Sequence, residues 1–283
     1  MKRYLNGRYV GERALYGLFD AEINHCVFED GESPLKEGSD LDISETEFRW
    51  KYPLWYCKNI KCRNVTFLKT ARSGIWYTDG ISFIDSSIIA PKTFRRSKNI
   101  SLTNVELPNA DETFWGCEGI KLFDVKAKGN YFGFNSSKVE VDKLYLDGDY
   151  AFDGGRDIVI RDSVLKSKDS FWNCENVVVI NSEIDGEYLA WNSKNITFIN
   201  CKISSHQGLC YMENVKLINC TFEVSDLIFE RCSGIDAQIV SEVESIKNPY
   251  SGRIVVKGLK TLIRDDRIID KSKTEIIVGN EKI

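Results

Sequence analysis

The chain has few of the residues on which common active sites depend. It contains only two His and two Met in 283 residues, and it has no apolar run long enough to cross a membrane. The basic residues that follow Met1 lead into no apolar segment, so we expect no secretory signal and a cytoplasmic protein. The net charge of −4 gives no reason to expect a nucleic acid or a membrane surface as partner.

Cofactor motifs are also missing. The sequence has no phosphate-cradling loop, metal-ligand spacing or nucleophile elbow, so we expect neither a cofactor nor a metal. The nine Cys are an odd number without zinc-like pairing, which favours reduced, buried thiols. Cys201 and Cys220 share one position in adjacent repeats, and a disulfide or a metal between them is the alternative.

What the sequence does have is a repeat. One phrase recurs with a bend residue at its fifth position, and four copies are IKCRNVTF (Ile60–Phe67), ISLTNVEL (Ile100–Leu107), ITFINCKI (Ile196–Ile203) and VKLINCTF (Val215–Phe222). Counted from the first residue of this phrase, repeats of 19 to 21 residues follow one another from Ala21 to Ile235. So constant a period indicates a stack of structural repeats.

The apolar residues within a repeat predict its strands. They stand at offsets 0 and 2, again at 5 and 7, and once more at 13, which is the period of two expected for short strands. We therefore predict an all-β, right-handed, single-stranded parallel β-helix of about twelve coils. We expect one domain over 1–283, with an N-terminal cap (1–20), the coils (21–250), and a divergent last coil with a C-terminal cap (251–283).

Two columns of Asn and Asp predict the bends between strands. Offset 4 holds mostly Asn and Asp from Asn64 to Asn219, and offset 18 holds mostly Asn from Asn59 to Asn214. Both residue types tolerate left-handed backbone and form local hydrogen bonds, so we interpret the columns as structural ladders. The small interior columns that contain most of the Cys have the same architectural explanation.

Offset 14 is the column that singles out a candidate site. Five of the six Trp fall in it, together with Arg95 and Asp153. Because unpaired charges are costly in a core, we place this column at a bend or on an outer face. One interpretation is a structural stack that packs on a cap or a partner chain. The other is a binding groove in which the aromatic residues face sugar rings.

Charged residues accompany this column. Arg72, Lys92, Arg95 and Arg96 cluster on one side of Trp115, and Asp149, Asp169 and Glu187 occupy neighbouring positions in three successive coils. Carboxylates this close should raise the pKa of at least one of them, as in a general acid, although acidic residues at a turn are usually just solvated. The two His do not form a triad, and His206 is the better candidate for an exposed titrating group.

Several segments resemble a bacterial family known as domain of unknown function 3737. They are DGESPLKE (Asp30–Glu37), KYPLWYC (Lys51–Cys57), GIWYTD (Gly74–Asp79), APKTFRR (Ala90–Arg96), FWNCEN (Phe171–Asn176) and GEYL (Gly186–Leu189). The resemblance covers nearly the whole chain. It implies a bacterial, cytosolic, pectin-lyase-like β-helix and no particular activity. The chain lacks the catalytic signatures of the polygalacturonases and pectate lyases that share this fold.

We therefore form two hypotheses. The first is a protein that binds or processes a carbohydrate, as a hydrolase or lyase if it is an enzyme. The expected substrate-binding residues are Trp76, Trp115, Trp172, Trp191, Tyr188, Lys92, Arg96 and Arg72. The expected catalytic residues are Asp153, Asp169, Glu187 and Arg95. The second hypothesis is a non-enzymatic scaffold whose aromatic column is buried against a cap or another subunit of a homo-oligomer.

Overall fold

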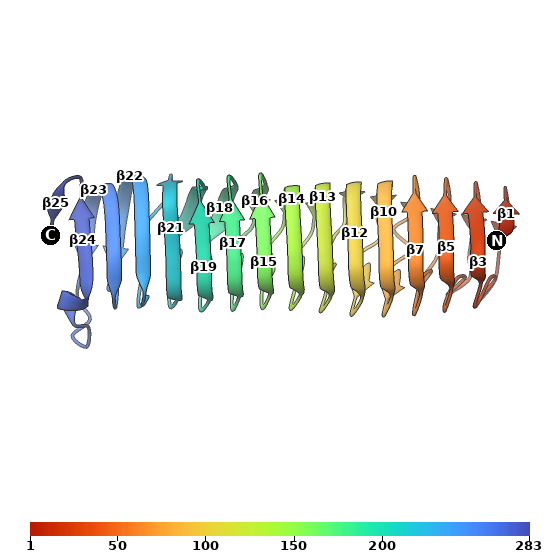
Figure 1. Ribbon diagram of the computed structural model, residues 1–283, viewed down its shortest axis with the longest axis horizontal. Helices are drawn as coiled ribbons and strands as arrows, with labels where there is room; N and C mark the ends of the chain where they lie inside the picture. The colour runs from red at the N-terminus through yellow and green to blue at the C-terminus, as the bar shows by residue number, and fades with distance from the viewer. The chain divides into compact units, whose positions relative to one another are not determined.

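The computed structural model describes all 283 residues and contains strands, bends and one 3-10 helix, η1 (Lys271–Lys273). The chain falls into two compact units, Met1–Leu146 and Asp147–Ile283. Within each unit, successive strands lie side by side in chain order (Figure 1). No helix is long and apolar enough to cross a membrane. The predicted all-β parallel β-helix is confirmed.

In the first unit, each coil begins with a main strand. These strands are β1 (Lys2–Leu5), β3 (Phe19–Asn24), β5 (Ser39–Ser44), β7 (Lys58–Arg63), β10 (Asp79–Ile88), β12 (Lys98–Leu107), β13 (Glu118–Lys128) and β14 (Ser137–Asp147). Shorter strands are β2 (Arg8–Tyr9), β4 (Val27–Phe28), β6 (Glu47–Phe48), β8 (Thr66–Phe67), β9 (Ile75–Trp76) and β11 (Phe94–Arg95). The parallel register joins Ala21 to Leu41, Leu41 to Ile60 and Ile81 to Ile100, the residues with which the sequence repeats begin.

The second unit repeats this plan. Its main strands are β15 (Arg156–Arg161), β17 (Glu175–Ile180), β19 (Lys194–Ile199), β21 (Glu213–Phe222), β22 (Ile235–Lys247), β23 (Gly252–Ile263) and β24 (Thr274–Val278). Its shorter strands are β16 (Val164–Lys166), β18 (Glu183–Glu187), β20 (Lys202–His206) and β25 (Glu281–Lys282). All the described pairings are parallel except that of β25, which returns antiparallel to β24.

The main strands mark eight coils in the first unit and seven in the second, whereas the repeat indicated about twelve in all. The three additional coils begin with β1, β23 and β24. In the register of their neighbours, Lys2, Gly252 and Thr274 stand where the repeat has an apolar first residue. These coils therefore lack the apolar signal by which the others were recognised.

The Asn and Asp columns form the bends, as predicted. The offset-4 residues from His25 to Asn219 all have φ between 47° and 57°, which is left-handed backbone. Their side chains form ladders, because Asn200 Nδ2 donates to Asn181 Oδ1 (3.1 Å) and Asn219 Nδ2 donates to Asn200 Oδ1 (2.9 Å). Asn suits this position because it tolerates left-handed backbone and because its side-chain amide forms hydrogen bonds to the Asn or Asp of the neighbouring coils.

The interior is built of stacked side chains of similar size. Phe94 and Phe114 lie face to face in adjacent coils, with ring centroids 4.7 Å apart. All nine Cys are free and buried, and burial raises the thiol pKa of Cys57 and of Cys117 to about 12. Cys201 and Cys220 lie at adjacent positions of neighbouring coils without a disulfide between them. The Cys therefore serve as small apolar residues.

Candidate functional site

We call the offset-14 residues the aromatic column. In the first unit its successive members are Trp55, Trp76, Arg95 and Trp115, and Phe134 follows these four. The rings of Trp55 and Trp76 are stacked, with centroids 5.0 Å apart and an interplanar angle of 9°. All four side chains are half-buried, as expected for a position at the surface of the coil.

Arg95 continues this stack although it carries a charge. Its guanidinium carbon lies 4.7 Å from the ring centroids of both Trp76 and Trp115, and its Nη2 lies 3.0 Å from Glu112. A planar guanidinium is attracted to aromatic faces, so it replaces an aromatic ring here without interrupting the column. The charge that marked this position in the sequence is thus compensated within the first unit.

The indole N–H groups of the column are also used internally. Trp55 Nε1 donates to the Ser73 carbonyl (2.6 Å), and Trp76 Nε1 donates to the Lys92 carbonyl (3.0 Å). Because neighbouring side chains cover the ring faces and backbone carbonyls accept the N–H groups, the Trp mainly present their edges to solvent. The column therefore holds successive coils together, and mainly the edges of its rings are accessible to a ligand.

A groove runs beside the column in the first unit, and we call it the column groove. It encloses about 730 Å³ and is lined by Lys69, Ile89, Pro91, Lys92, Asn109, Asp111, Glu112, Asn130 and Tyr131. Lys92 Nζ lies 2.9 Å from Glu112, the carboxylate that also binds Arg95. The wall of the groove is therefore tied to the aromatic column through Glu112.

Two tyrosines next to the column are more exposed than the Trp. Tyr56 and Tyr77 directly follow Trp55 and Trp76, are 49% and 37% exposed, and stack on each other at 4.9 Å. Arg72 and Arg96 are also exposed, but they do not line the column groove. Of the three basic residues predicted to bind substrate, only Lys92 lines the groove, where it shares Glu112 with Arg95, which was predicted as catalytic; Arg72 and Arg96 lie apart from the groove.

In the second unit the column holds a second stack. Trp172 and Trp191 lie 5.7 Å apart at an angle of 8°, and their Nε1 atoms donate to the carbonyls of Tyr188 and Gln207, each at 2.6 Å. The Tyr188 ring packs edge-on against Trp191 at 5.1 Å and against His206 at 5.9 Å. His206 Nδ1 lies 2.5 Å from Asp226 Oδ2, so this imidazole has a carboxylate partner.

Among the predicted acids, Asp169 has the most unusual surroundings. It is only 8% exposed, and its Oδ1 has no hydrogen-bond partner. Burial raises the pKa of this carboxyl, and the negative charges of Asp149 and Glu187 raise it further. Lys168 acts in the opposite direction, but its ammonium is bound to Glu187 at 3.1 Å.

The other predicted acids have partners. Asp153 Oδ1 accepts from Asn173 Nδ2 (3.0 Å), whose own Oδ1 accepts from Asn192 Nδ2 (2.9 Å), so Asp153 begins an amide ladder. Glu187 is paired with Lys168. Their catalytic role stays a prediction. No group of three or more His, Cys, Asp or Glu is arranged to hold a metal ion.

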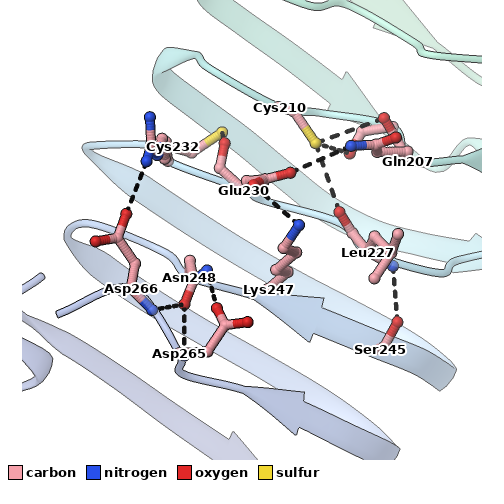
Figure 2. Close-up of polar contacts among 12 residues, drawn as sticks. Gln207, Cys210, Leu227, Glu230, Cys232, Ser245, Lys247, Asn248, Asp265 and Asp266 are labelled. Atoms are coloured by element: carbon pink, nitrogen blue, oxygen red, sulfur yellow. Dashed lines mark hydrogen bonds and ion pairs between the residues drawn. The ribbon is translucent and has the colours of Figure 1, made fainter.

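Three charged residues around the column were not predicted from the sequence. Figure 2 shows Glu230 with Lys247 on one side and Gln207 on the other, at 3.1 Å and 3.2 Å. Glu230 follows Cys210 in the column and is buried, and Lys247 immediately precedes Asn248, the residue in register with Glu230. An inserted residue in the coil of Glu230 moved it out of the counted register, and Lys247 stands at offset 12 of the last assigned coil, not at offset 14. Glu112 was not predicted either, and the only feature of the sequence that could have indicated it was its position one coil after the cluster of basic residues.

Parallel strands in register, bends of left-handed Asn and an aromatic column together define a β-helix protein. The chain belongs to the family described as protein of unknown function (DUF3737), whose model matches residues 2–277. The family resemblance expected from the sequence is therefore confirmed. No curated protein matches the chain.

Solved structures similar to the chain come from several functional groups. PfbA, a surface protein and adhesin of Streptococcus pneumoniae, is 12% identical over 82% of this chain and 91% of its own, with a TM-score of 0.47. QnrB1, a plasmid-mediated fluoroquinolone resistance protein, is 15% identical over 65% and 86%, with a TM-score of 0.28. The catalytic domain of a GH87 α-1,3-glucanase is 11% identical over 99% and 63%, with a TM-score of 0.27. These values carry no argument about function.

Proposed function

We propose that the protein binds an uncharged oligosaccharide in the column groove. The observation that carries this proposal is the composition of a groove of about 730 Å³. Its lining combines two ammonium groups, carboxylates and amides with the aromatic ring of Tyr131. Such a set supplies hydrogen bonds to hydroxyl groups and an apolar surface for a sugar ring, which is the usual composition of a ligand site.

Charge pairing in the groove favours a neutral sugar. The lining holds the cations Lys69 and Lys92. Lys92 is bound to Glu112, as is Arg95 of the adjoining column, so Lys69 is the one cation of the groove outside these ion pairs. Beyond Lys69, an anionic ligand would have to break these ion pairs and face Asp111 and Glu112 in the same groove. A neutral ligand leaves the pairs intact and hydrogen-bonds to their outer atoms.

The experiment is a titration of the full chain with neutral hexasaccharides of glucose, in α- and β-linked forms, measured by isothermal titration calorimetry. We expect binding of one or more of them, and we expect Tyr131→Ala to weaken it about tenfold, which corresponds to about 1.4 kcal/mol. Trp115→Ala should weaken binding as well, because Trp115 supports Tyr131 with ring centroids 6.1 Å apart.

A matched control is Phe123→Ala. Phe123 is an exposed aromatic residue of β13 in the same unit, and it does not line the groove. Its removal should leave the affinity unchanged within about twofold. Equal loss of affinity in Phe123→Ala and Tyr131→Ala, or tighter binding of an oligogalacturonate than of every neutral sugar, would contradict the proposal.

The scaffold remains a second candidate, and one observation favours it. Trp55 stacks on Trp76 and Trp172 on Trp191, and all four donate their N–H groups to backbone carbonyls of the chain, as a column with a structural role requires. In that case the exposed pair of Tyr56 and Tyr77 is the surface for a partner, including a second copy of the chain. Sedimentation equilibrium of Tyr56→Ser/Tyr77→Ser beside the wild type tests this, since loss of a dimer in the variant supports the scaffold.

A further inference from the structure

The bend at offset 18 carries a second hydrogen-bonded ladder. In the second unit, Asn176 Nδ2 donates to Asp157 Oδ1 (3.0 Å), Asn195 Nδ2 to Asn176 Oδ1 (3.0 Å) and Asn214 Nδ2 to Asn195 Oδ1 (2.9 Å). Each interior amide therefore donates to the coil before it and accepts from the coil after it. Each side-chain Oδ1 of the ladder therefore accepts a hydrogen bond wherever the following coil has an Asn at the same position.

In the first unit, glycine interrupts this ladder. Asn59 Nδ2 donates to Asp40 Oδ1 (2.9 Å), but the next coil has Gly80 at the ladder position. Asn99 Nδ2 donates to Asp79 Oδ1 (2.7 Å), and the coil after it has Gly119. The Oδ1 atoms of Asn59 and Asn99 therefore have no side-chain donor above them. Two acceptors point to a position from which a side chain is missing.

A groove lies at this interruption, and we call it the ladder groove. It encloses about 580 Å³ and is lined by Met1, Asp40, Leu41, Asp42, Asn59, Ile60, Lys61, Gly80, Ile81, Ser82, Asn99 and Ser101. It crosses β5, β7, β10 and β12 and shares no lining residue with the column groove. The absence of a side chain at Gly80 opens its middle.

The second wall of the ladder groove begins with the carboxylate of Asp42, which lies beside Lys61 in the parallel register, and continues with hydrogen-bond donors on the strands. The parallel register places Lys61 beside Ser82, and Ser82 beside Ser101. Adjacent strands are about 4.8 Å apart, so these donors recur at the spacing of the coils. Lys61 forms no ion pair, in contrast to Lys92 of the column groove. Its ammonium is therefore available to a ligand.

We propose that the ladder groove is a second binding site, which takes a hydroxyl-rich ligand, namely a short oligosaccharide lying across the strands. Amide oxygens on one wall accept from hydroxyl groups, and Lys61, Ser82 and Ser101 on the other wall donate to them. Between the walls, the strands at Leu41, Ile60 and Ile81 form the floor of the groove. The proposal rests on the ligand class proposed above but not on the column groove.

The decisive variant is Gly80→Asn. Gly80 has φ +76°, a conformation that Asn tolerates, and an added Cβ would lie 3.1 Å from Asn59 Oδ1, the tip of a side chain that can shift. The new amide would continue the ladder, as Asn195 does above Asn176, so the variant should fold while it fills the groove. We expect its affinity for the neutral hexasaccharide to fall at least about tenfold at this site.

The matched control is Gly234→Asn. Gly234 interrupts the same ladder above Asn214 in the second unit and lies outside the ladder groove. Circular dichroism should show that both variants are folded, and two-dimensional NMR of the wild type should show shifts of the Ser82 and Ser101 amides on titration. Lys61→Gln should weaken binding in the same direction as Gly80→Asn.

The outcomes separate the two grooves. Loss of binding in Gly80→Asn with retention in Tyr131→Ala supports the ladder groove and contradicts the column groove. Retention in a folded Gly80→Asn, with no shift of the Ser82 and Ser101 amides, overturns the ladder groove and leaves the column groove standing. If no hexasaccharide binds the wild-type chain at millimolar concentration, both proposals are wrong.

Discussion

The Arg95 guanidinium lies 4.7 Å from the ring centroid of Trp115. Arg95 occupies a position that holds an aromatic side chain in the neighbouring coils. The same distance separates it from Trp76, and Glu112 completes its surroundings at 3.0 Å. A charge that would be costly alone is thus held by two aromatic faces and one carboxylate. The relationship explains how a column of Trp includes Arg without losing its stack.

The first prediction follows from the shape of this cation. Arg95→Lys keeps the charge but loses the planar group that stacks on both indoles. Two cation–π contacts of this kind are together worth about 1–2 kcal/mol, so the free energy of unfolding should fall by about that amount. Urea unfolding monitored by Trp fluorescence measures it. The same change at exposed Arg96 should cost less than about 0.5 kcal/mol, and a similar loss at both positions would argue against stacking.

The second prediction concerns the indole N–H groups. Trp191→Phe preserves an aromatic ring in the stack with Trp172 but removes the donor to the Gln207 carbonyl. Loss of one such hydrogen bond, with the smaller ring, should lower the free energy of unfolding by about 1–3 kcal/mol. Trp50 stands outside the column and is the control. If Trp50→Phe and Trp191→Phe have equal effects in urea unfolding, the N–H is not important for stability.

The third prediction is a pH dependence at Asp169. Because its pKa is raised in the folded protein, protonated Asp169 favours the native state, and this contribution is lost as the pH rises from the usual Asp value through the raised one. Asp169→Asn mimics the protonated carboxyl. It should raise Tm at pH 7 by about 2–4 °C, as expected for about 1 kcal/mol in a chain of this size, and should have less effect at pH 4.

Exposed Asp185 of β18 provides the control for this measurement. Asp185→Asn should change Tm little at either pH. A decrease of Tm in Asp169→Asn at pH 7 would mean that the carboxylate form is the favoured one, in contradiction to its burial beside Asp149 and Glu187.

The fourth prediction concerns the ion pair of Glu230 and Lys247. Removal of either partner leaves the other charge partly buried, so Glu230→Gln and Lys247→Met should each cost about 2–4 kcal/mol, and the double variant should cost less than their sum. Glu230 also raises the pKa of Lys247. The pair therefore contributes its stability below the usual Lys value and loses it as the pH rises through the raised pKa. Additive single effects in urea unfolding would show that the partners do not interact.

The repeating coil could be predicted from sequence because its rules are local. Asn64, Asn104 and Asn200 each mark a bend by their own backbone preference, and the alternating residues around them assign each side chain to the interior or the surface. The coils that were not counted lack this signal, as at Lys2 and Gly252. The candidate site was harder to predict because it depends on side chains that meet across coils.

The sequence by itself determined the parallel β-helix, the position of the bends and the column that gathers Trp76, Arg95 and Trp115. Only the tertiary structure decided how that column is used. Three features depend on which residues stack above one another. They are the ion pair of Arg95 with Glu112, the ion pair of Lys247 with Glu230, and the interruption of the Asn ladder at Gly80. A single inserted residue changes that stacking without altering the local pattern, because register between coils is a property of the folded chain.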